Sequence, residues 1–257
     1  MIMSLVKLFR DKTFSAGYNE YLTPDDDTGL RFQILQMTAN SEETILSNEC
    51  ETALLIIEGK GTLEYNNQEI KFDRNNWIEQ NPVAAHFPAG DEIKITTEED
   101  TRLAVISTLN SSRFDGKIYL PEEIDVERRG ENILDGTCYR LVRLVFDRTI
   151  APENAKLVLG EVLNFPGRWS SYPPHHHIQP EIYYYEFSPQ EGYGHGELGE
   201  DVFNIKHQDL LKITDSKDHS QVSAPGYHMY YIWAIRHLDD APYTGFEFTK
   251  PFDKLLE

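Results

Sequence analysis

The sequence predicts an all-β protein built from two antiparallel modules. Short apolar or alternating runs recur along the chain, and their Val, Ile, Leu and Tyr content favours β-strands. Gly, Asn and Pro separate these runs at close spacing, which is typical of sandwiches and barrels. A similar order of strands and turns occurs at residues 49–107 and 156–235, so the chain repeats one module. At 257 residues, it is long enough for two small domains.

Eight runs have the clearest strand character. In chain order they are residues 53–58, 62–65, 92–97, 103–107, 139–146, 156–165, 181–187 and 227–235. Gly59-Lys60-Gly61 and Asn66-Asn67 predict turns after the first two strands, because Gly and Asn tolerate turn conformations. Helices are expected at residues 5–12, at residues 121–125 and from Pro251 onward.

The segment from residue 110 to 129 is the natural connector between the modules. It is rich in Ser, Asp, Glu and Gly, which favours an irregular segment. We expect the boundary near residue 115, giving an N-terminal domain of residues 1–115 and a C-terminal domain of residues 116–257. The N-terminal domain has one histidine, His86, and no His-x-His pair. We therefore expect it to lack a metal site and to be structural or to assist oligomerisation.

Composition excludes several classes of protein. The chain has 24 Lys and Arg against 43 Asp and Glu, a formal net charge of −19, which argues against nucleic-acid and anionic-membrane partners. No apolar run is long enough to span a membrane, and the apolar start is too short for a signal peptide. Cys50 and Cys138 have no CxxC spacing, which argues against thiolate zinc sites and disulfide scaffolds. We expect a cytoplasmic protein.

The densest chemical signal is a histidine triplet followed by an aromatic strand that begins with a glutamate. Side chains alternate faces along a strand, so His175 and His177 should share a face while His176 points the other way. Glu181 opens the next strand. Two imidazoles and a carboxylate would then converge, and this set suits zinc, iron, nickel or manganese. A histidine triplet alone is more often a solvated turn, but its place between Pro-Pro and this strand favours metal ligation.

A further ligand should come from a distant strand, since two neighbouring strands cannot surround an ion alone. His219 is the expected ligand because it follows an alternating run and precedes the strand that ends at Pro225-Gly226. His228 is the alternative. The remaining single histidines are expected on the surface or in the core: His86, His195, His207 and His237. Three histidines and a glutamate leave coordination positions open, as a catalytic metal requires.

The spacing His175-x-His177-x3-Glu181, followed by His219, resembles the two cupin motifs, which lie inside a small jelly-roll barrel. A more specific resemblance is to the 5-deoxy-glucuronate isomerase family of inositol catabolism, which is related to 5-keto-4-deoxyuronate isomerase. It covers residues 165–235 and rests on three stretches: Trp169-Ser-Ser-Tyr-Pro-Pro-His175, Glu181-Ile-Tyr-Tyr-Tyr185, and Ala224-Pro-Gly-Tyr227 with Tyr230-Tyr231 and Trp233. Members of that family are bicupins, so the resemblance implies two cupin (jelly-roll) barrels in one chain.

The resemblance also implies an activity and a ligand set. The expected enzyme is a metal-dependent isomerase that interconverts an aldose and a ketose, with 5-deoxy-glucuronate as the expected substrate. Carried over by position, the ligands of one divalent ion would be His175, His177, Glu181 and His219. We expect zinc first, with manganese, iron and nickel as alternatives.

Isomerisation moves a proton between adjacent carbons, so the site needs a base and a group that binds the sugar acid. The candidate bases are a metal-bound water, Glu181, Tyr183 and Tyr185. A uronate carboxylate needs a fixed cationic side chain for binding, because the net negative charge of this protein repels anions. The candidate substrate contacts are Arg143, Arg168 and Tyr231.

Two other functions stay open at this point. A cupin dioxygenase would hold iron or nickel with the same ligands and activate oxygen. A non-catalytic sugar-binding cupin would keep the barrel and lose the chemistry. All of these functions imply a small-molecule partner, here a sugar acid, rather than nucleic acid or membrane, and a homo-oligomer is compatible with each.

Overall fold

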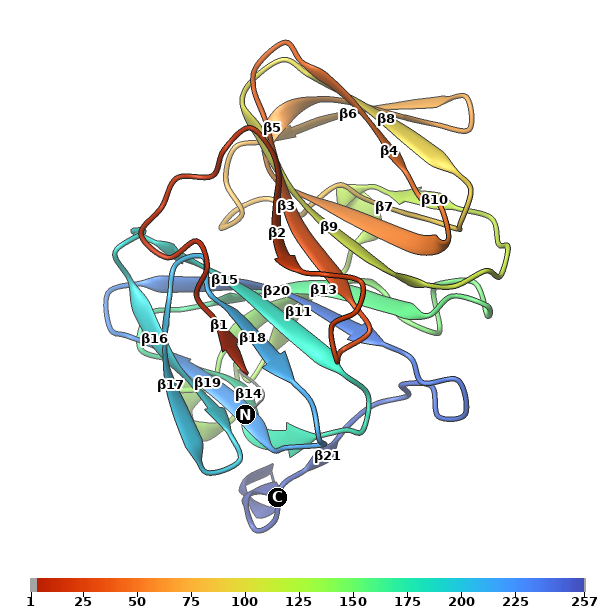
Figure 1. Cartoon of the computed structure of the whole chain (residues 1–257). Coiled ribbons are helices and arrows are strands. Elements are labelled where there is room, and N and C mark those ends of the chain that lie inside the picture. Colours follow the sequence, from red (N-terminus) through yellow and green to blue (C-terminus); the bar gives the residue numbers. More distant parts are fainter. Residues whose placement is uncertain (1–3, 257) are drawn as a thin grey trace. The chain divides into compact units, whose positions relative to one another are not determined.

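A computed structural model describes residues 4–256 and confirms that the chain is nearly all β (Figure 1). The first three residues, part of the short apolar start considered above, lie outside the described residues. The chain forms two compact units. What we call the N-terminal unit comprises residues 13–125 and Val145–Val158, and the C-terminal unit comprises residues 4–12, Val126–Leu144 and 159–256.

These units are not contiguous in the sequence, whereas the expected domains were. The main change of unit, between Asp125 and Val126, falls inside the expected connector. Residues 4–12 group with the C-terminal unit because β1 (Leu5–Val6) pairs antiparallel with β18 (Leu210–Ile213). Two strands that pair across about 200 positions share no local sequence signal. The sequence alone therefore could not assign residues 4–12 to the C-terminal unit.

Residues 13–125 contain nine strands in one sheet network. Its main path runs β10-β7-β5-β9-β3-β2, and β4, β6 and β8 attach to it. The strands are β2 (Gly17–Leu22), β3 (Arg31–Met37), β4 (Glu42–Leu46), β5 (Cys50–Tyr65), β6 (Gln68–Arg74), β7 (Ala84–Phe87), β8 (Glu92–Thr97), β9 (Thr101–Leu109) and β10 (Lys117–Tyr119). Their inward side chains form an apolar core that includes Leu54, Ile56, Leu63, Phe87 and Ile95.

Strand β5 corrects the turn predicted at Gly59-Lys60-Gly61. It is one long strand whose first part pairs with β7 and β9 and whose second part pairs with β6 and β8. The register with β9 shifts between Ile56 and Glu58, and Gly59 has a φ of +126°. A glycine is therefore used here to bend a strand from one set of partners to another, rather than to end it.

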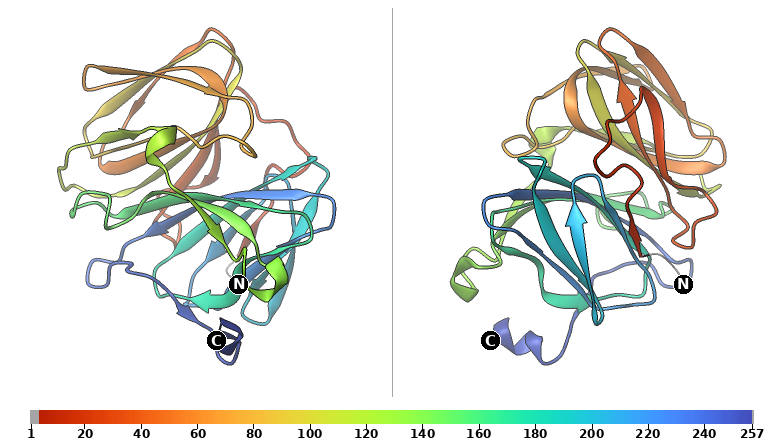
Figure 2. Two further views of the ribbon diagram at one scale, coloured as in Figure 1. Left: turned by 180° about the vertical axis from the view of Figure 1, so that it is seen from behind. Right: turned by 60° about the vertical axis from the view of Figure 1, so that its left-hand side comes forward.

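The C-terminal unit consists mainly of two antiparallel sheets (Figure 2). One has the order β1-β18-β15-β20-β13-β12-β11 and the other β17-β16-β19-β14-β21. The strands not yet given are β11 (Val126–Arg129), β12 (Arg140–Phe146), β13 (Leu157–Asn164), β14 (Trp169–His176), β15 (Glu181–Ser188), β16 (Tyr193–Leu198), β17 (Asp201–Lys206), β19 (His219–Ser223), β20 (His228–Arg236) and β21 (Glu247–Phe248). Its core includes Val162, Tyr185, Phe187, Leu211 and Met229.

The helices of the described residues are short 3-10 turns. They are η1 (Pro121–Glu123), η2 (Leu134–Gly136) and η3 (Phe252–Leu256). The predictions near residue 121 and after Pro251 therefore hold in location. The helix predicted at residues 5–12 is wrong. Leu5 is buried in the edge strand β1, and Arg10 forms an ion pair with Asp209, so tertiary contacts hold this segment in a non-helical course.

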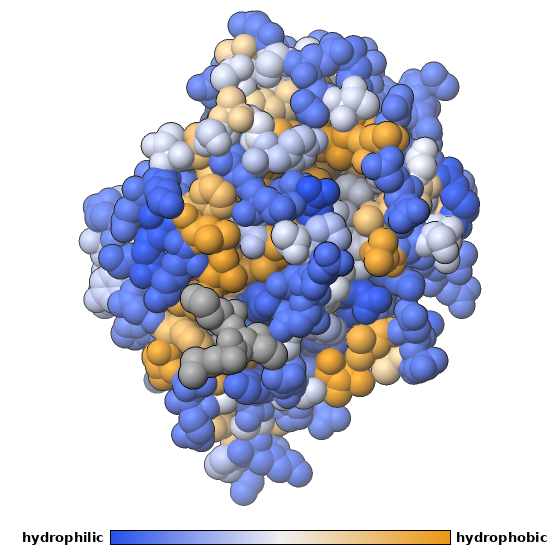
Figure 3. All heavy atoms as spheres, viewed as in Figure 1, coloured by the Kyte–Doolittle hydropathy of each residue, from blue (hydrophilic) through white to orange (hydrophobic). Residues whose placement is uncertain are grey.

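Among residues 4–256, no helix has the length and apolar character needed to cross a bilayer. The face drawn in Figure 3 is mostly hydrophilic, with apolar side chains in scattered patches. This surface agrees with the formal net charge of −19.

Candidate metal centre

Three strand ends of the C-terminal unit bring the predicted ligands together. His177 directly follows β14, Glu181 is the first residue of β15, and His219 is the first residue of β19. Strands β14 and β19 pair so that His175 lies opposite His219. Their register shifts between Ser170 and His175, a bulge that re-aims the side chains beyond it.

His177, Glu181 and His219 form a compact and buried cluster. One potential ligand atom from each lies within 4.8 Å of the others. His177 Nε2 is 3.0 Å from Glu181 Oε2, and His219 Nε2 is 3.4 Å from the same oxygen. Two imidazole nitrogens thus face one carboxylate, which is a donor set that divalent metals use.

The tautomer of His219 supports metal binding. Its Nδ1 is 3.0 Å from the backbone oxygen of Lys217, and a carbonyl oxygen only accepts, so Nδ1 donates the hydrogen bond. In the neutral ring Nε2 then presents a lone pair toward Glu181. This buried nitrogen has no hydrogen-bond partner among the described residues. A lone pair facing a carboxylate is unfavourable unless a cation lies between them, so the residues present fit a divalent ion.

His175 lies beside this cluster rather than within it. Its ring centroid is 4.3 Å from that of His219, and its Nδ1 is 3.3 Å from the backbone oxygen of Ser171, which again leaves Nε2 as the free acceptor. Burial and the nearby His219 hold the pKa of His175 well below 6.5, so its ring is neutral. The ligand role predicted for His175 stays a prediction.

The two other histidines considered near this site lie elsewhere. His176 is partly exposed, and its Nδ1 lies 2.8 Å from Asp218. His228, the alternative to His219, opens β20 opposite Ser188 and packs edge-on against Phe165. It is not a member of the buried cluster.

The environment keeps Glu181 ionised. Burial raises the pKa of this carboxyl, but the imidazoles of His177 and His219 outweigh burial and lower it to about 2. The ionised Glu181 contributes one negative charge to the cluster, which a divalent cation would more than balance.

The two predicted tyrosines have different surroundings. Tyr183 lines the pocket next to the cluster, with its ring centroid 5.9 Å from that of His219. Burial and the charge of Glu181 raise its pKa well above 10, so it stays a protonated hydrogen-bond donor. Tyr185 donates its hydroxyl proton to Gln221 and does not line the pocket. Tyr231 does line it, and its hydroxyl lies 2.7 Å from that of Ser170.

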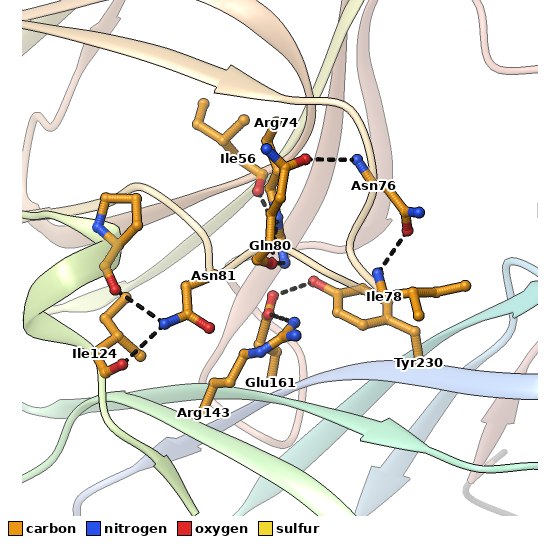
Figure 4. A network of polar contacts seen from close by, with 11 residues as sticks. Ile56, Arg74, Asn76, Ile78, Gln80, Asn81, Ile124, Arg143, Glu161 and Tyr230 are labelled. Carbon is orange, nitrogen blue, oxygen red and sulfur yellow. Dashed lines mark hydrogen bonds and ion pairs between the residues drawn. The ribbon is translucent and has the colours of Figure 1, made fainter.

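Arg143 and Arg168 are not among the residues that line this pocket, and their predicted contact with substrate is not tested. The buried Arg143 forms an ion pair of 2.8 Å with Glu161, whose other oxygen accepts a hydrogen bond from Tyr230 (Figure 4). Arg168 donates to the backbone oxygen of Gly136 and stacks on aromatic rings. Both side chains are thus held by structural partners.

Two other arginines, Arg129 and Arg140, line the pocket instead, together with Tyr243 and Phe246. Sequence reasoning missed all four residues. Arg140 lies within the run predicted as a strand at residues 139–146, so the strand itself was foreseen. Its pocket-facing direction depends on the register of β11 with β12, for which the sequence carries no local signal.

The C-terminal unit thus holds a buried histidine and carboxylate cluster within an all-β cupin fold, and the comparisons with known proteins agree. A cupin 2 conserved barrel domain protein from Leptotrichia buccalis superposes with a TM-score of 0.54 at 12% identity, covering 92% of this chain and 97% of that one. An IolB-like protein from Salmonella typhimurium LT2 superposes with a TM-score of 0.82 at 21% identity, covering 95% of this chain and 97% of that one.

The chain belongs to the KduI/IolB family, whose model matches residues 9–255. A 5-deoxy-glucuronate isomerase of Geobacillus thermodenitrificans is 27% identical over 78% of this chain and 77% of its own length. A 5-deoxy-glucuronate isomerase of Halalkalibacterium halodurans is 24% identical over 88% of this chain and 86% of its own length. The family resemblance inferred from residues 165–235 is therefore confirmed and extends over nearly the whole chain.

Proposed function

We propose that this chain is a metal-dependent isomerase that interconverts the aldose and ketose forms of a uronate-type sugar, with 5-deoxy-glucuronate as its substrate. The observation that carries the proposal is the buried cluster of His177, Glu181 and His219 beside a pocket lined by tyrosine and arginine. The names of the relatives supply the substrate. We further propose that the enzyme acts in the cytoplasm and in inositol catabolism.

The residues present favour one divalent ion per site, held by His177, Glu181 and His219, with His175 as a fourth ligand. Zinc is our first choice, because neutral imidazole and carboxylate are common zinc ligands, and manganese, iron and nickel accept the same set. When bound, the ion would supply Lewis acidity that stabilises negative charge developing on the carbonyl oxygen of the sugar.

The chain's own residues would hold and move the protons. Tyr183 keeps its hydroxyl proton and faces the pocket, so it would donate a hydrogen bond to a sugar oxygen as charge develops there. Glu181 is the candidate base of this proposal, because its carboxylate is ionised and lies at the pocket. Tyr185 is a packing residue in this proposal, because its hydroxyl is engaged by Gln221.

The test is an activity assay linked to metal analysis. The protein is purified without added metal, its bound metal is measured, and isomerisation of 5-deoxy-glucuronate is followed before and after chelation. We expect about one metal ion per chain, loss of activity on chelation, and recovery when the ion is returned. A chelated protein that keeps full activity would contradict the proposed metal dependence.

The two other functions are outcomes of the same experiment. Oxygen consumption that depends on substrate and metal, without isomerisation, would assign a dioxygenase. Sugar-acid binding without turnover by the metal-loaded protein would assign a non-catalytic binding cupin.

A further inference from the structure

We propose that Arg140, assisted by Arg129, binds the carboxylate of the sugar and makes this site selective for acidic over neutral substrates. The inference deepens the proposed function and rests on it for the identity of the sugar. It starts from an unusual feature of the pocket wall: two arginines lie directly opposite each other on neighbouring strands. Arg129 of β11 is the register partner of Arg140 of β12, and both line the pocket.

Like charges directly opposite each other destabilise a sheet. Here the pair is more costly than usual, because only 5% of Arg140 is exposed. Burial is the main cause that lowers the pKa of this guanidinium, and the charge of Arg129 lowers it further. An arrangement that works against the fold is expected where function requires it.

Arg140 has no ion-pair partner among residues 4–256. Its Nη1 donates to the backbone oxygen of Cys138 at 2.8 Å and lies 3.5 Å from that of Tyr172. The carboxylate whose charge acts on Arg140 is that of Glu127, and Arg129 already donates two hydrogen bonds to it. Buried charges are normally paired, so a buried guanidinium with carbonyl contacts only, facing a pocket, indicates an anionic ligand.

The pocket wall connects this arginine to the metal cluster. Tyr231 lies within the electrostatic reach of Arg140, and its ring is 5.0 Å from that of Tyr183. Tyr183 is in turn 5.9 Å from His219, centroid to centroid. A ligand with a carboxylate at one end and a carbonyl at the other would meet the arginines and the cluster together. The open-chain form of a uronate has this layout.

The geometry also explains how so acidic a chain would bind an acid. A net charge of −19 repels anions at long range. A guanidinium buried in a low-dielectric wall acts at short range, where its hydrogen bonds to a carboxylate are strong and can be bidentate. The arginine pair would therefore supply affinity for the carboxylate that the overall field of the protein opposes.

The test compares two substrates and a matched set of variants. The substrates are 5-deoxy-glucuronate and the analogue whose carboxylate is replaced by a primary amide. The variants are Arg140→Gln, Arg140→Lys and Arg129→Gln, with Arg128→Gln as control. Arg128 lies on the same strand as Arg129, is largely exposed, and is paired with Glu131 outside the pocket.

We expect Arg140→Gln to lose roughly 10- to 100-fold in kcat/KM on the acid, mainly through KM, because charged hydrogen bonds to the carboxylate are lost. Its kcat/KM on the amide should stay within about threefold of the wild type, since a neutral group gains little from the guanidinium. Arg140→Lys should retain part of the selectivity because it keeps the charge without the planar fork. Arg128→Gln should match the wild type on both substrates.

Equal losses on acid and amide in Arg140→Gln would mean that Arg140 only supports the pocket, and unchanged activity on the acid would overturn its role as well. If Arg140→Gln does not fold, Arg129→Gln decides, because its side chain is partly exposed and its loss of selectivity should be smaller but in the same direction. A wild-type enzyme that isomerises neither compound would refute the proposed function. Calorimetric titration with acid and amide would then still decide whether Arg140 binds a carboxylate.

Discussion

His176 and His177 are adjacent in the sequence but have opposite surroundings, which gives a matched pair of variants. His177 contacts Glu181 in the buried cluster, whereas His176 contacts Asp218 and is partly exposed. We predict that His177→Ala loses most of its bound metal and at least about 100-fold in activity, since loss of one ligand weakens the site strongly. His176→Ala should keep both. Metal analysis and the isomerase assay on the two folded variants check this, and an active His177→Ala would refute the ligand assignment.

Tyr183 and Tyr185 form a second pair that the structure separates. Tyr183→Phe removes a proton donor from the pocket and should lower kcat by about 100-fold while the bound metal stays constant. Tyr185→Phe leaves the buried Gln221 without its donor and should cost about 1–2 kcal/mol in the free energy of unfolding, with kcat nearly unchanged. Steady-state kinetics and urea unfolding measure the two effects. Similar kcat losses in both variants would contradict the division of roles.

The alternation of side chains along a strand was enough to predict which histidines of the triplet would share a face. It could not predict the partners of the arginines. Arg140 and Arg143 are three residues apart on one strand, so alternation puts them on opposite faces, but it does not tell which face meets Glu161 and which meets the pocket. Which arginine meets which acid depends on residues brought together from other strands, and a single sequence does not record those contacts.

Among the strands, β5 shows how one glycine can be fixed by packing alone. A Cβ added to Gly61 would lie 2.1 Å from the backbone oxygen of Thr96 and 3.0 Å from Thr97 Cα, and backbone atoms there cannot move aside. We predict that Gly61→Ala destabilises the protein by about 2–3 kcal/mol through overpacking. The control is Gly17→Ala, where φ is +92° but nothing lies within 4 Å, so only about 1 kcal/mol of backbone strain is expected. Urea unfolding of both variants tests the difference.

The start of β5 also carries a buried carboxylate that should make the protein sensitive to acid. Glu51 accepts hydrogen bonds from His86, from Asn110 and from the backbone nitrogens of Lys156 and Leu157, all at 2.7–2.9 Å. Burial raises the pKa of Glu51, but these donors outweigh it and hold the pKa below 4.5. The unfolded chain therefore takes up the proton first as the pH falls. The stability that Glu51 contributes is complete above about pH 5 and is lost at lower pH.

In Glu51→Gln, the free energy of unfolding should therefore decrease less steeply as the pH falls. At pH 7 the variant should be less stable than the wild type by about 1–3 kcal/mol, since donors that served a carboxylate now face an amide. As the pH falls through the lowered pKa of Glu51, the stabilities of the two proteins should converge. Urea unfolding at a series of pH values measures this, and parallel profiles would show that Glu51 is not the group responsible.

At the level of elements, the sequence predicted strands well and their ends poorly. Alternation and β-branched residues identified the runs that became β8, β9, β15 and β20. The Gly-x-Gly at residue 59 was predicted as a turn because glycine tolerates both a turn and a bent strand, and only the pairing partners distinguish them. The edge strand β1 was predicted as a helix for a related reason. It has only two residues, which are too few to show the alternation of side chains that identifies a strand.

For the whole molecule, we predict one metal ion per chain. The one cluster of metal-ligand type found among residues 4–256 is His177, Glu181 and His219. In the N-terminal unit, the ring of His86 is instead hydrogen-bonded to Glu51 and stacked on the ring of Phe146. Metal analysis of the purified protein should give a ratio near one that falls to near zero in His177→Ala. A second equivalent that survives this substitution would place another site outside the cluster.

The wall of the pocket includes Tyr243 and Phe246, and β21 pairs with β14 beside His175. During synthesis on the ribosome, residues 13–158 emerge first and contain everything that the N-terminal unit needs. His177 and His219 are synthesised later, and Tyr243, whose ring packs against that of His177, follows His219 in the chain. The proposed ligands would therefore be synthesised before Tyr243 and Phe246, so in a nascent chain an ion could bind before this part of the pocket wall is in place.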